Sequence, residues 1–224
     1  MRYLRSRIRA IARRLDRAYG TPPAPRRLPP LDELVLTILS QNTSDTNRDR
    51  AYSDLRRAFP TWDDVADAPV PAIARAIHRG GLAPTKAPRL KAALAALRER
   101  GVALGDGALL DWQDDRALFD LLVSLPGVGP KTAACVLLFS CGRPYFPVDT
   151  HVHRLAIRLG LMPPAATAVA TQVALQAVVP PGLVYEVHMN LIRHGREVCV
   201  AHRPYCSGCV LADLCPRVGV VAPR

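Results

Sequence analysis

The sequence lacks the features of a membrane or secreted protein. No apolar run in its 224 residues reaches the roughly 20 residues that a membrane-spanning helix needs. The N-terminal segment is rich in arginine, but no apolar stretch of roughly 7–15 residues follows it, which excludes a secretory signal. We therefore expect a soluble intracellular protein of the cytoplasm, a monomer without a membrane partner.

The sequence also lacks the patterns of sheets and repeats. No stretch alternates apolar and polar residues over several positions, and neither an internal repeat nor a low-complexity tail occurs. Apolar residues recur at helical spacing instead, as in Leu4, Ile8, Ile11, Leu15 and Tyr19. Since 49% of the residues are hydrophobic, the chain can form one large domain or two small ones. The predicted fold class is all-α, held together by helix packing.

The pattern places eleven helices and one connector along the chain. A proline-rich, extended connector is expected at 21–30, Asp32 is the expected N-cap of the second helix, and Thr61 that of a short one. Helices are expected at 1–19, 31–40, 45–59, 61–65, 72–78, 87–100, 116–124, 131–141, 150–159, 166–178 and 183–196.

Acidic residues are clearly outnumbered by basic ones. The chain has 30 lysines and arginines against 19 aspartates and glutamates, a net charge of 30 − 19 = +11. Proteins with such an excess bind polyanions, because neutralising phosphates releases counterions. This favours a nucleic acid as partner, with a solvated basic surface or ribosome association as the alternatives.

Lysine itself is scarce, since only Lys86, Lys91 and Lys131 occur and the other basic residues are arginines. Arginine suits phosphate contacts, because its charged fork forms paired hydrogen bonds. It does not lose its proton to become an amine nucleophile. Each lysine is therefore a candidate for a role that arginine cannot fill.

A glycine-rich segment, Leu125-Pro126-Gly127-Val128-Gly129-Pro130-Lys131-Thr132, lies between two predicted helices. Its prolines and glycines favour a tight turn, and Pro130 suits the first turn of the next helix. Free N–H groups of the loop and of the helix start then form a nest for an anion, such as a backbone phosphate. An ordinary helix–turn–helix connection with a glycine cap is the alternative.

Lys131 stands in the first turn of that next helix, where the helix dipole is already positive. This mismatch, with partial burial, is expected to lower its pKa, and a neutral amine can form a Schiff base with a sugar carbon. A simple phosphate contact is the alternative. Asp149, in Pro147-Val148-Asp149-Thr150-His151, is a candidate partner carboxylate that stabilises oxocarbenium-like charge, or simply the N-cap of a helix.

Four of the six cysteines, Cys199, Cys206, Cys209 and Cys215, fall within 17 residues. In an intracellular chain this clustering favours metal ligation over disulfides. Zinc and a [4Fe–4S] cluster both accept four thiolates, but the uneven spacing differs from the two separated pairs typical of structural zinc. The intervening loop with Arg203 is a candidate phosphate contact, and Cys135 and Cys141 are expected in the core.

These motifs together resemble the endonuclease III family of the helix-hairpin-helix DNA glycosylase superfamily. The resemblance rests on LPGVGPKTA, VDTH and the four spaced cysteines, in the same order and spacing. It implies a six-helix barrel domain at 29–137, ending in the helix-hairpin-helix. It also implies a discontinuous domain, 1–28 plus 138–224, that carries the [4Fe–4S] cluster, with double-stranded DNA bound across the cleft between the domains.

The resemblance also assigns roles to individual residues. It implies that Lys131 is the nucleophile, that Asp149 assists it, and that Cys199, Cys206, Cys209 and Cys215 ligate the cluster. The damaged nucleotide is expected to be flipped out of the duplex. The residues expected to contact DNA are Gln41, Asn42, Leu82, Leu125, Gly127, Val128, Gly129, Thr132, His151 and Arg203.

Two segments depart from the family pattern. Asn42 stands where glutamine is common at the DNA wedge, and Gly81-Leu82-Ala83-Pro84-Thr85-Lys86-Ala87 lacks the family's tyrosine, with Leu82 at a second wedge position. Both segments are expected near the lesion, so they bear on the choice of substrate.

The expected function is base excision repair by a bifunctional DNA glycosylase and abasic-site lyase, at the nucleoid if the source is bacterial. Oxidised pyrimidines such as thymine glycol are the expected substrates. One alternative is a related glycosylase for uracil or thymine mismatched with guanine, or for alkylated purines. An alternative of another class is a non-catalytic module that binds damaged DNA.

Overall fold

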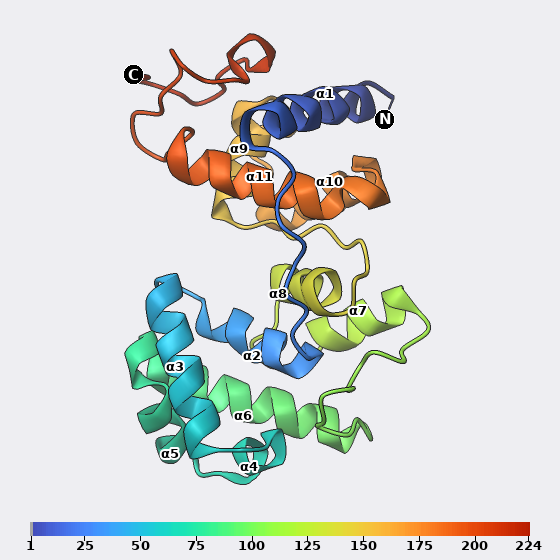
Figure 1. The fold of residues 1–224 in the computed structure, drawn as a ribbon, viewed down its shortest axis with the longest axis vertical. Coiled ribbons are helices and arrows are strands. Elements are labelled where there is room, and N and C mark those ends of the chain that lie inside the picture. The colour runs from blue at the N-terminus through green and yellow to red at the C-terminus, as the bar shows by residue number, and fades with distance from the viewer. Residues whose placement is uncertain (1) are drawn as a thin grey trace. The chain divides into compact units, whose positions relative to one another are not determined.

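A computed structural model describes residues 2–224, and every regular element in that range is a helix (Figure 1). The predicted all-α class is confirmed, although Met1, the first position of the first predicted helix, lies outside the described residues. The chain forms two compact units. One is continuous, Arg26–Arg143, and the other is discontinuous and combines the residues up to Pro25 with Pro144–Arg224. The breaks between them lie at 25/26 and 143/144, whereas the sequence predicted breaks at 28/29 and 137/138. The second difference arises because the last helical turn before Arg143 packs on the continuous unit.

The continuous unit contains seven α-helices and two short helical turns. They are α2 (Pro30–Leu39), α3 (Asp45–Ala58), α4 (Trp62–Asp67), α5 (Val70–Ala76), the 3₁₀ turn η1 (His78–Gly80), α6 (Ala83–Glu99), α7 (Asp115–Val123), α8 (Pro130–Cys135) and the π turn η2 (Val136–Ser140). Helix α6 packs on α4 and α5, while α2 contacts α3, α6, α8 and η2. The buried side of α2 is therefore the centre of this unit.

Asp32 does not cap α2, which corrects the sequence prediction. The helix begins at Pro30 with Pro29 as N-cap and no side-chain cap. Asp32 is 7% exposed and lies inside the first turn. It accepts hydrogen bonds from the Tyr52 hydroxyl and, at 3.1 Å, from Trp62 Nε1. Its carboxylate thus ties α2 to α3 and α4 instead of ending a helix.

Helix α6 begins at Ala83, four residues before the predicted start. Proline is tolerated in the first turn of a helix, because the first N–H groups have no partner inside the helix. Pro84 occupies that turn, while Pro88 lies within the helix. Both prolines are therefore part of the helix, and Lys86 lies within its first two turns.

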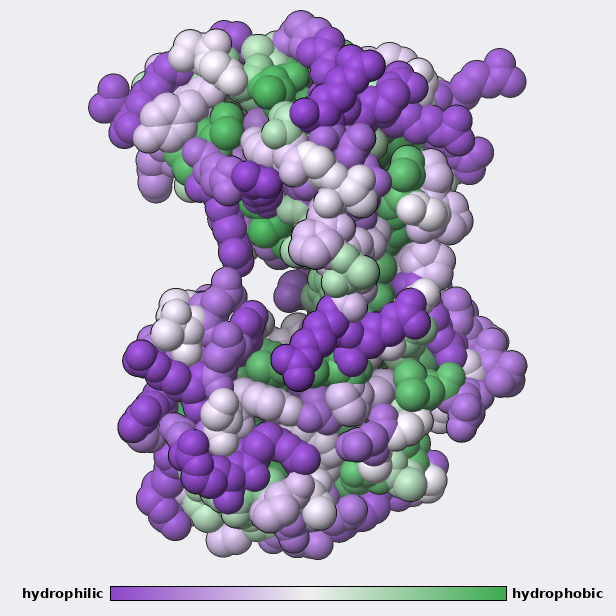
Figure 2. Space-filling view, in the orientation of Figure 1, coloured by the Kyte–Doolittle hydropathy of each residue, from purple (hydrophilic) through white to green (hydrophobic). Residues whose placement is uncertain are grey.

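The discontinuous unit contains α1 (Arg2–Tyr19), α9 (Thr150–Arg158), α10 (Ala168–Val178), the turn η3 (Pro181–Leu183), α11 (Val184–Glu197) and the turn η4 (Ala212–Leu214). Helix α1 packs on α10 and α11 through Ile8, Ile11 and Leu15. Hydrophilic side chains gather over its outer face (Figure 2). Among residues 2–224 no single helix is long and apolar enough to cross a membrane, and only the bent pair of α10 with Pro181–Glu197 passes that test jointly.

Candidate active site and cysteine cavity

The glycine-rich segment forms a tight turn between α7 and α8. The Val128 N–H donates to the Leu125 carbonyl at 3.1 Å, and both side chains are buried. Leu125 and Val128, predicted to contact DNA, are thus almost wholly buried, with 3% and 5% of their surface exposed. Gly127 has a left-handed φ of +77°, whereas Gly129 has an ordinary φ of −97°. Only the first of the two glycines therefore needs the conformational freedom of glycine.

The N-terminus of α8 has no side-chain cap at its N-cap residue, Gly129. Side chains do cap α3, α4, α7, α9 and α10. The first N–H groups of an uncapped helix can hydrogen-bond an anion. Lys131 stands in this first turn and is half-buried, next to the buried Thr132. The turn and the helix start thus combine backbone donors with a single amine.

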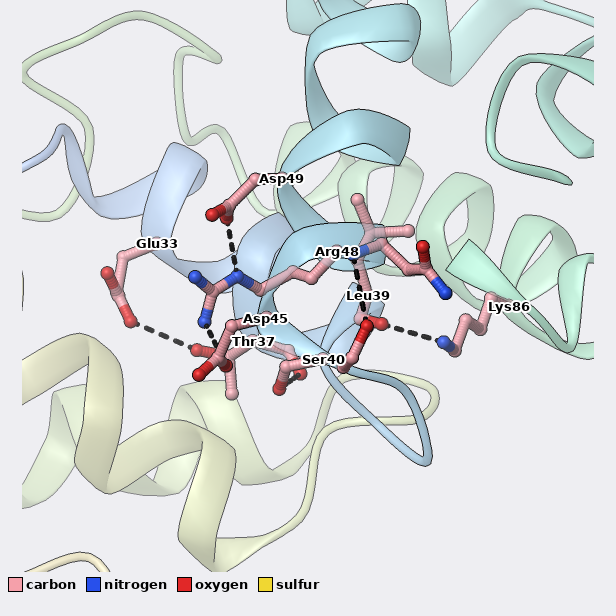
Figure 3. Close-up of polar contacts among 10 residues, drawn as sticks. Glu33, Thr37, Leu39, Ser40, Asp45, Arg48, Asp49 and Lys86 are labelled. Atoms are coloured by element: carbon pink, nitrogen blue, oxygen red, sulfur yellow. Dashed lines mark hydrogen bonds and ion pairs between the residues drawn. The ribbon is translucent and has the colours of Figure 1, made fainter. Parts of the chain in front are cut away.

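Glu33 in α2 is a half-buried acid in the same unit as Lys131. Its Oε1 accepts a hydrogen bond from the Thr37 hydroxyl at 3.1 Å (Figure 3). Burial raises the pKa of Glu33 to about 7, while the Thr37 bond and the charges of Lys131 and Arg48 oppose that rise. Lys131 is thus near enough for its charge to act on this carboxyl. Glu33 was not among the predicted site residues, although a lone glutamate in the largely apolar segment Leu31–Leu39 was a usable signal.

Asp149 lies in the discontinuous unit and is the N-cap of α9. Its Oδ1 accepts a hydrogen bond from the Val152 N–H at 2.8 Å, so the capping alternative is realised. A carboxylate has two oxygens, and one cap does not exhaust its acceptor capacity. His151, in the first turn of the same helix, contacts Arg154 Nη2 through Nδ1 at 3.1 Å. These side chains are half-buried and held by their own helix.

The two predicted wedge segments belong to the continuous unit and share one backbone feature. Asn42 and Leu82 both adopt left-handed φ values, 52° and 53°, which side-chain-bearing residues rarely do. Asn42 is exposed, and Leu82 is 51% exposed although it is a large apolar residue. Gln41 Oε1 lies 3.5 Å from Arg89 Nη1 of α6. Strained and exposed backbone of this kind is typical of functional sites.

The four clustered cysteines line one cavity in the discontinuous unit, together with Arg158 and His194. All four are free thiols. Four cysteine thiolates are the donor set that a [4Fe–4S] cluster requires.

Arg158, which the sequence analysis did not single out, organises the cavity wall. It is 8% exposed and donates to the carbonyls of Val200 and Ala201 at 2.7 and 2.8 Å. Its Nη1 also lies 3.3 Å from Cys199 Sγ. Arg203, in the loop that follows, is exposed and has a left-handed φ of 50°. Of the two remaining cysteines, Cys135 is in the core as predicted, whereas Cys141 is only partly buried.

Comparisons with known proteins agree with this geometry. Residues 35–181 match the family described as HhH-GPD superfamily base excision DNA repair protein. The chain is 38% identical over 197 residues to an Arabidopsis thaliana protein named "Putative DNA glycosylase", covering 86% of this chain and 63% of that relative. It is 32% identical over 186 residues to endonuclease III of Thermotoga maritima, covering 83% and 82%. The solved structure of a trapped endonuclease III–DNA covalent intermediate matches with a TM-score of 0.81 at 26% identity, covering 95% and 96%.

Proposed function

Because the chain belongs to the HhH-GPD superfamily of base excision DNA repair proteins, and within it to the endonuclease III family, we propose that it is a DNA glycosylase and abasic-site lyase. It acts on double-stranded DNA that contains a damaged base or an abasic site, as a monomer of the cytoplasm. One observation carries the proposal: a half-buried lysine, Lys131, stands in the uncapped first turn of α8, directly after the glycine turn.

Lys131 is the proposed nucleophile. Its neutral amine bonds to C1′ of the flipped nucleotide, and the damaged base leaves with the electrons of the glycosidic bond. Nitrogen then loses a proton and the sugar ring opens, with O4′ taking up a proton, which gives the Schiff base. Loss of a proton from C2′ breaks the C3′–O bond, so the strand is nicked on the 3′ side of the site.

Asp149 is the proposed assisting carboxylate. Departure of the base leaves oxocarbenium-like positive charge on the sugar, and a carboxylate stabilises such charge. The hydrogen bond from Val152 fixes one carboxylate oxygen in the first turn of α9. Capping and catalysis are therefore compatible roles for this residue. The backbone of Gly127 and Gly129, the Thr132 region, His151 and Arg203 are proposed to contact the DNA backbone.

The proposed cofactor is a [4Fe–4S] cluster held by Cys199, Cys206, Cys209 and Cys215. The support is the chemistry of the donor set, four free thiols around one cavity. When bound, such a cluster links four points of the C-terminal loop through strong metal–thiolate bonds. The chain's own contribution is Arg158, whose cation lies beside Cys199 Sγ. The loop that carries Arg203 would thereby be kept in one shape.

Borohydride trapping tests the nucleophile. Borohydride reduces a Schiff base to a stable amine, so wild-type protein should crosslink to a duplex with an abasic site. Lys131→Gln should not crosslink. Lys91→Gln is the matched control, because Lys91 Nζ is occupied by the carbonyls of Asp67 and Ala68, at 3.3 and 2.7 Å. A wild-type protein that never crosslinks would contradict the lysine nucleophile and the lyase step.

Oxidised pyrimidines, such as thymine glycol, are the proposed lesions. The second candidate is a substrate of related glycosylases: uracil or thymine opposite guanine, or an alkylated purine. Asn42 and the missing tyrosine of the Gly81–Ala87 segment favour keeping it, because both are departures from the family pattern. A panel of duplexes with one lesion each decides between them. Excision confined to mismatches or to alkylated purines would contradict the oxidised-pyrimidine assignment.

A further inference from the structure

Lys86 is a fully buried lysine whose ammonium group joins two chain segments. It is 1% exposed. Nζ donates to the carbonyl of Leu39 at 2.7 Å and to the carbonyl of Gly80 at 2.8 Å. In Figure 3 the side chain reaches from its helix to the Leu39 carbonyl. Both partners are neutral carbonyls, so this cation is buried against backbone oxygens.

The two carbonyls are the ends of two helical elements. Leu39 is the last residue of α2, and Gly80 is the last residue of η1. The final carbonyls of a helix lack partners within it and carry partial negative charge, which favours a cation. Burial lowers the pKa of Lys86. Burying a lysine costs free energy. The cost is offset where the hydrogen bonds of the lysine fix the positions of chain segments that an apolar side chain would not hold.

Each of these carbonyls is followed within three residues by one of the exposed left-handed residues. Asn42 comes three positions after Leu39, and Leu82 comes two positions after Gly80. The main chain of Lys86 also takes part, because its N–H donates to the Leu82 carbonyl at 2.9 Å. One residue of α6 therefore holds the segment before Asn42 and both sides of Leu82.

Helix α6 also reaches the glycine turn. The aliphatic part of Arg89, one turn after Lys86, lies against Gly127, and its guanidinium is 3.5 Å from Gln41 Oε1. The first two turns of α6 thus contact both wedge segments and the turn that precedes Lys131. They provide a common base for three segments that are far apart in the sequence.

We propose that Lys86 is a positioning residue that locks the Asn42 and Leu82 segments in one arrangement before DNA binds. The two segments then enter the duplex together, one filling the space of the extruded nucleotide and the other holding the opposite strand. Ordering them in advance spares the cost of ordering them on binding. This inference rests on the proposed function, since it assumes that both segments act on DNA.

The test compares Lys86→Met with Lys91→Met. The control is matched: Lys91 lies in the same helix and also donates to two backbone carbonyls, but to those at the end of α4. Two substrates are used with the full, metal-loaded protein, a lesion-containing duplex and a preformed abasic site in single-stranded DNA. Only the duplex requires a base to be extruded and the gap to be filled.

Lys86→Met should slow single-turnover excision from the duplex by about 10- to 100-fold, the size of effect expected when contacting groups are misplaced by about 1 Å. Its borohydride trapping on the single-stranded abasic site should stay within about twofold of wild type, as should both activities of Lys91→Met. Equal losses on both substrates would mean a merely structural role and overturn the inference. Failure of wild-type trapping would instead overturn the proposed function.

A double-mutant cycle tests whether Lys86→Met slows excision through the Asn42 and Leu82 segments. If Lys86 acts through the wedges, Lys86→Met should slow the duplex reaction far less in an Asn42→Ala, Leu82→Ala background than alone. Full additivity would contradict the proposal.

Hydrogen exchange on the unaltered protein gives a test that needs no variant at position 86. The amides of Ser40 and Gly81 directly follow the two carbonyls that Lys86 binds. If one ammonium group holds both segments, the segments should open together, and the protection factors of the two amides should agree within about tenfold. Independent opening would overturn the proposal even if Lys86→Met did not fold.

Discussion

Gly127 lies directly against the side chain of Arg89. A Cβ atom at position 127 would stand 2.7 Å from Arg89 Cδ and 2.9 Å from Cβ and Cγ of the same side chain. The glycine also has a φ of +77°. Two independent constraints, a left-handed backbone and a close approach to α6, therefore require glycine at this position of the turn.

We predict that Gly127→Ala is destabilising and weakens DNA binding. The left-handed conformation costs a side-chain-bearing residue about 1 kcal/mol, and displacing Arg89 adds to that cost. For a chain of this size, each kcal/mol lowers the melting temperature by about 2–4 °C. Thermal unfolding and affinity for abasic-site DNA measure both effects.

Gly129→Ala is the stability control for this prediction. Gly129 has an ordinary φ of −97°, and no atom lies within 4 Å of a Cβ built there. Its melting temperature should therefore stay close to that of the wild type. Equal destabilisation by both substitutions would show that the contact with Arg89 and the left-handed φ are not what the turn requires.

Glu33 predicts a pH dependence of stability. Its pKa in the folded chain is about 7, against an ordinary value of 4.5, so the folded state binds the proton more tightly than the unfolded state. The unfolding free energy should therefore fall as pH rises from about 4.5 to about 7 and then level off, by about 3 kcal/mol in all. Glu33→Gln, which cannot ionise, should remove this part of the dependence.

Urea unfolding at several pH values between 5.5 and 8 measures that difference. Glu33→Gln should be the more stable protein at pH 8, where the wild type carries a half-buried charge, and close to the wild type at the acid end. Identical slopes in the two proteins would mean that Glu33 does not titrate in this range. Asp64→Asn serves as a comparison for the direction of the effect. Asp64 is an exposed capping residue, and its pKa is lowered, whereas that of Glu33 is raised.

The sequence predicted the parts of the site that depend on local patterns. The glycine turn, Lys131, the helix after Asp149 and the four cysteines are each defined by a few adjacent residues with their own backbone requirements. Helix class and most helix positions followed for the same reason, since apolar spacing is a local property.

Features that join distant segments were not predictable in this way. Glu33 and Lys86 are both polar side chains on apolar helix faces, and only packing shows that one is near Lys131 and the other joins α2 to η1. Asp32 failed as a predicted N-cap for a related reason: its partners, Tyr52 and Trp62, are 20 and 30 residues away. Tertiary hydrogen bonds outweighed local capping preference there.

The metal bound by the purified protein distinguishes the two possible centres. We expect a brown protein with a broad visible absorption band and about four iron and four sulfide per chain, as a [4Fe–4S] cluster requires. The measurement is elemental analysis together with the visible spectrum. A colourless protein with one zinc per chain would contradict the assignment. Whichever metal is bound, replacing any one of the four cysteines by serine should leave little of it in the purified protein.

Arg158 should control how well the cluster is retained. Arg158→Met keeps most of the volume but removes the donors to the Val200 and Ala201 carbonyls and the cation beside Cys199 Sγ. Since the two carbonyls lose hydrogen bonds from a charged donor, the loop should loosen and the iron content per chain should fall. The matched control is Arg14→Met, which breaks an ion pair with Asp213 whose side chains are 40% and 58% exposed. Exposed pairs contribute about 0–1 kcal/mol, so the control should keep its iron. If both variants retain iron equally through repeated exposure to a chelator, the hydrogen bonds of Arg158 do not hold the cysteine loop in place.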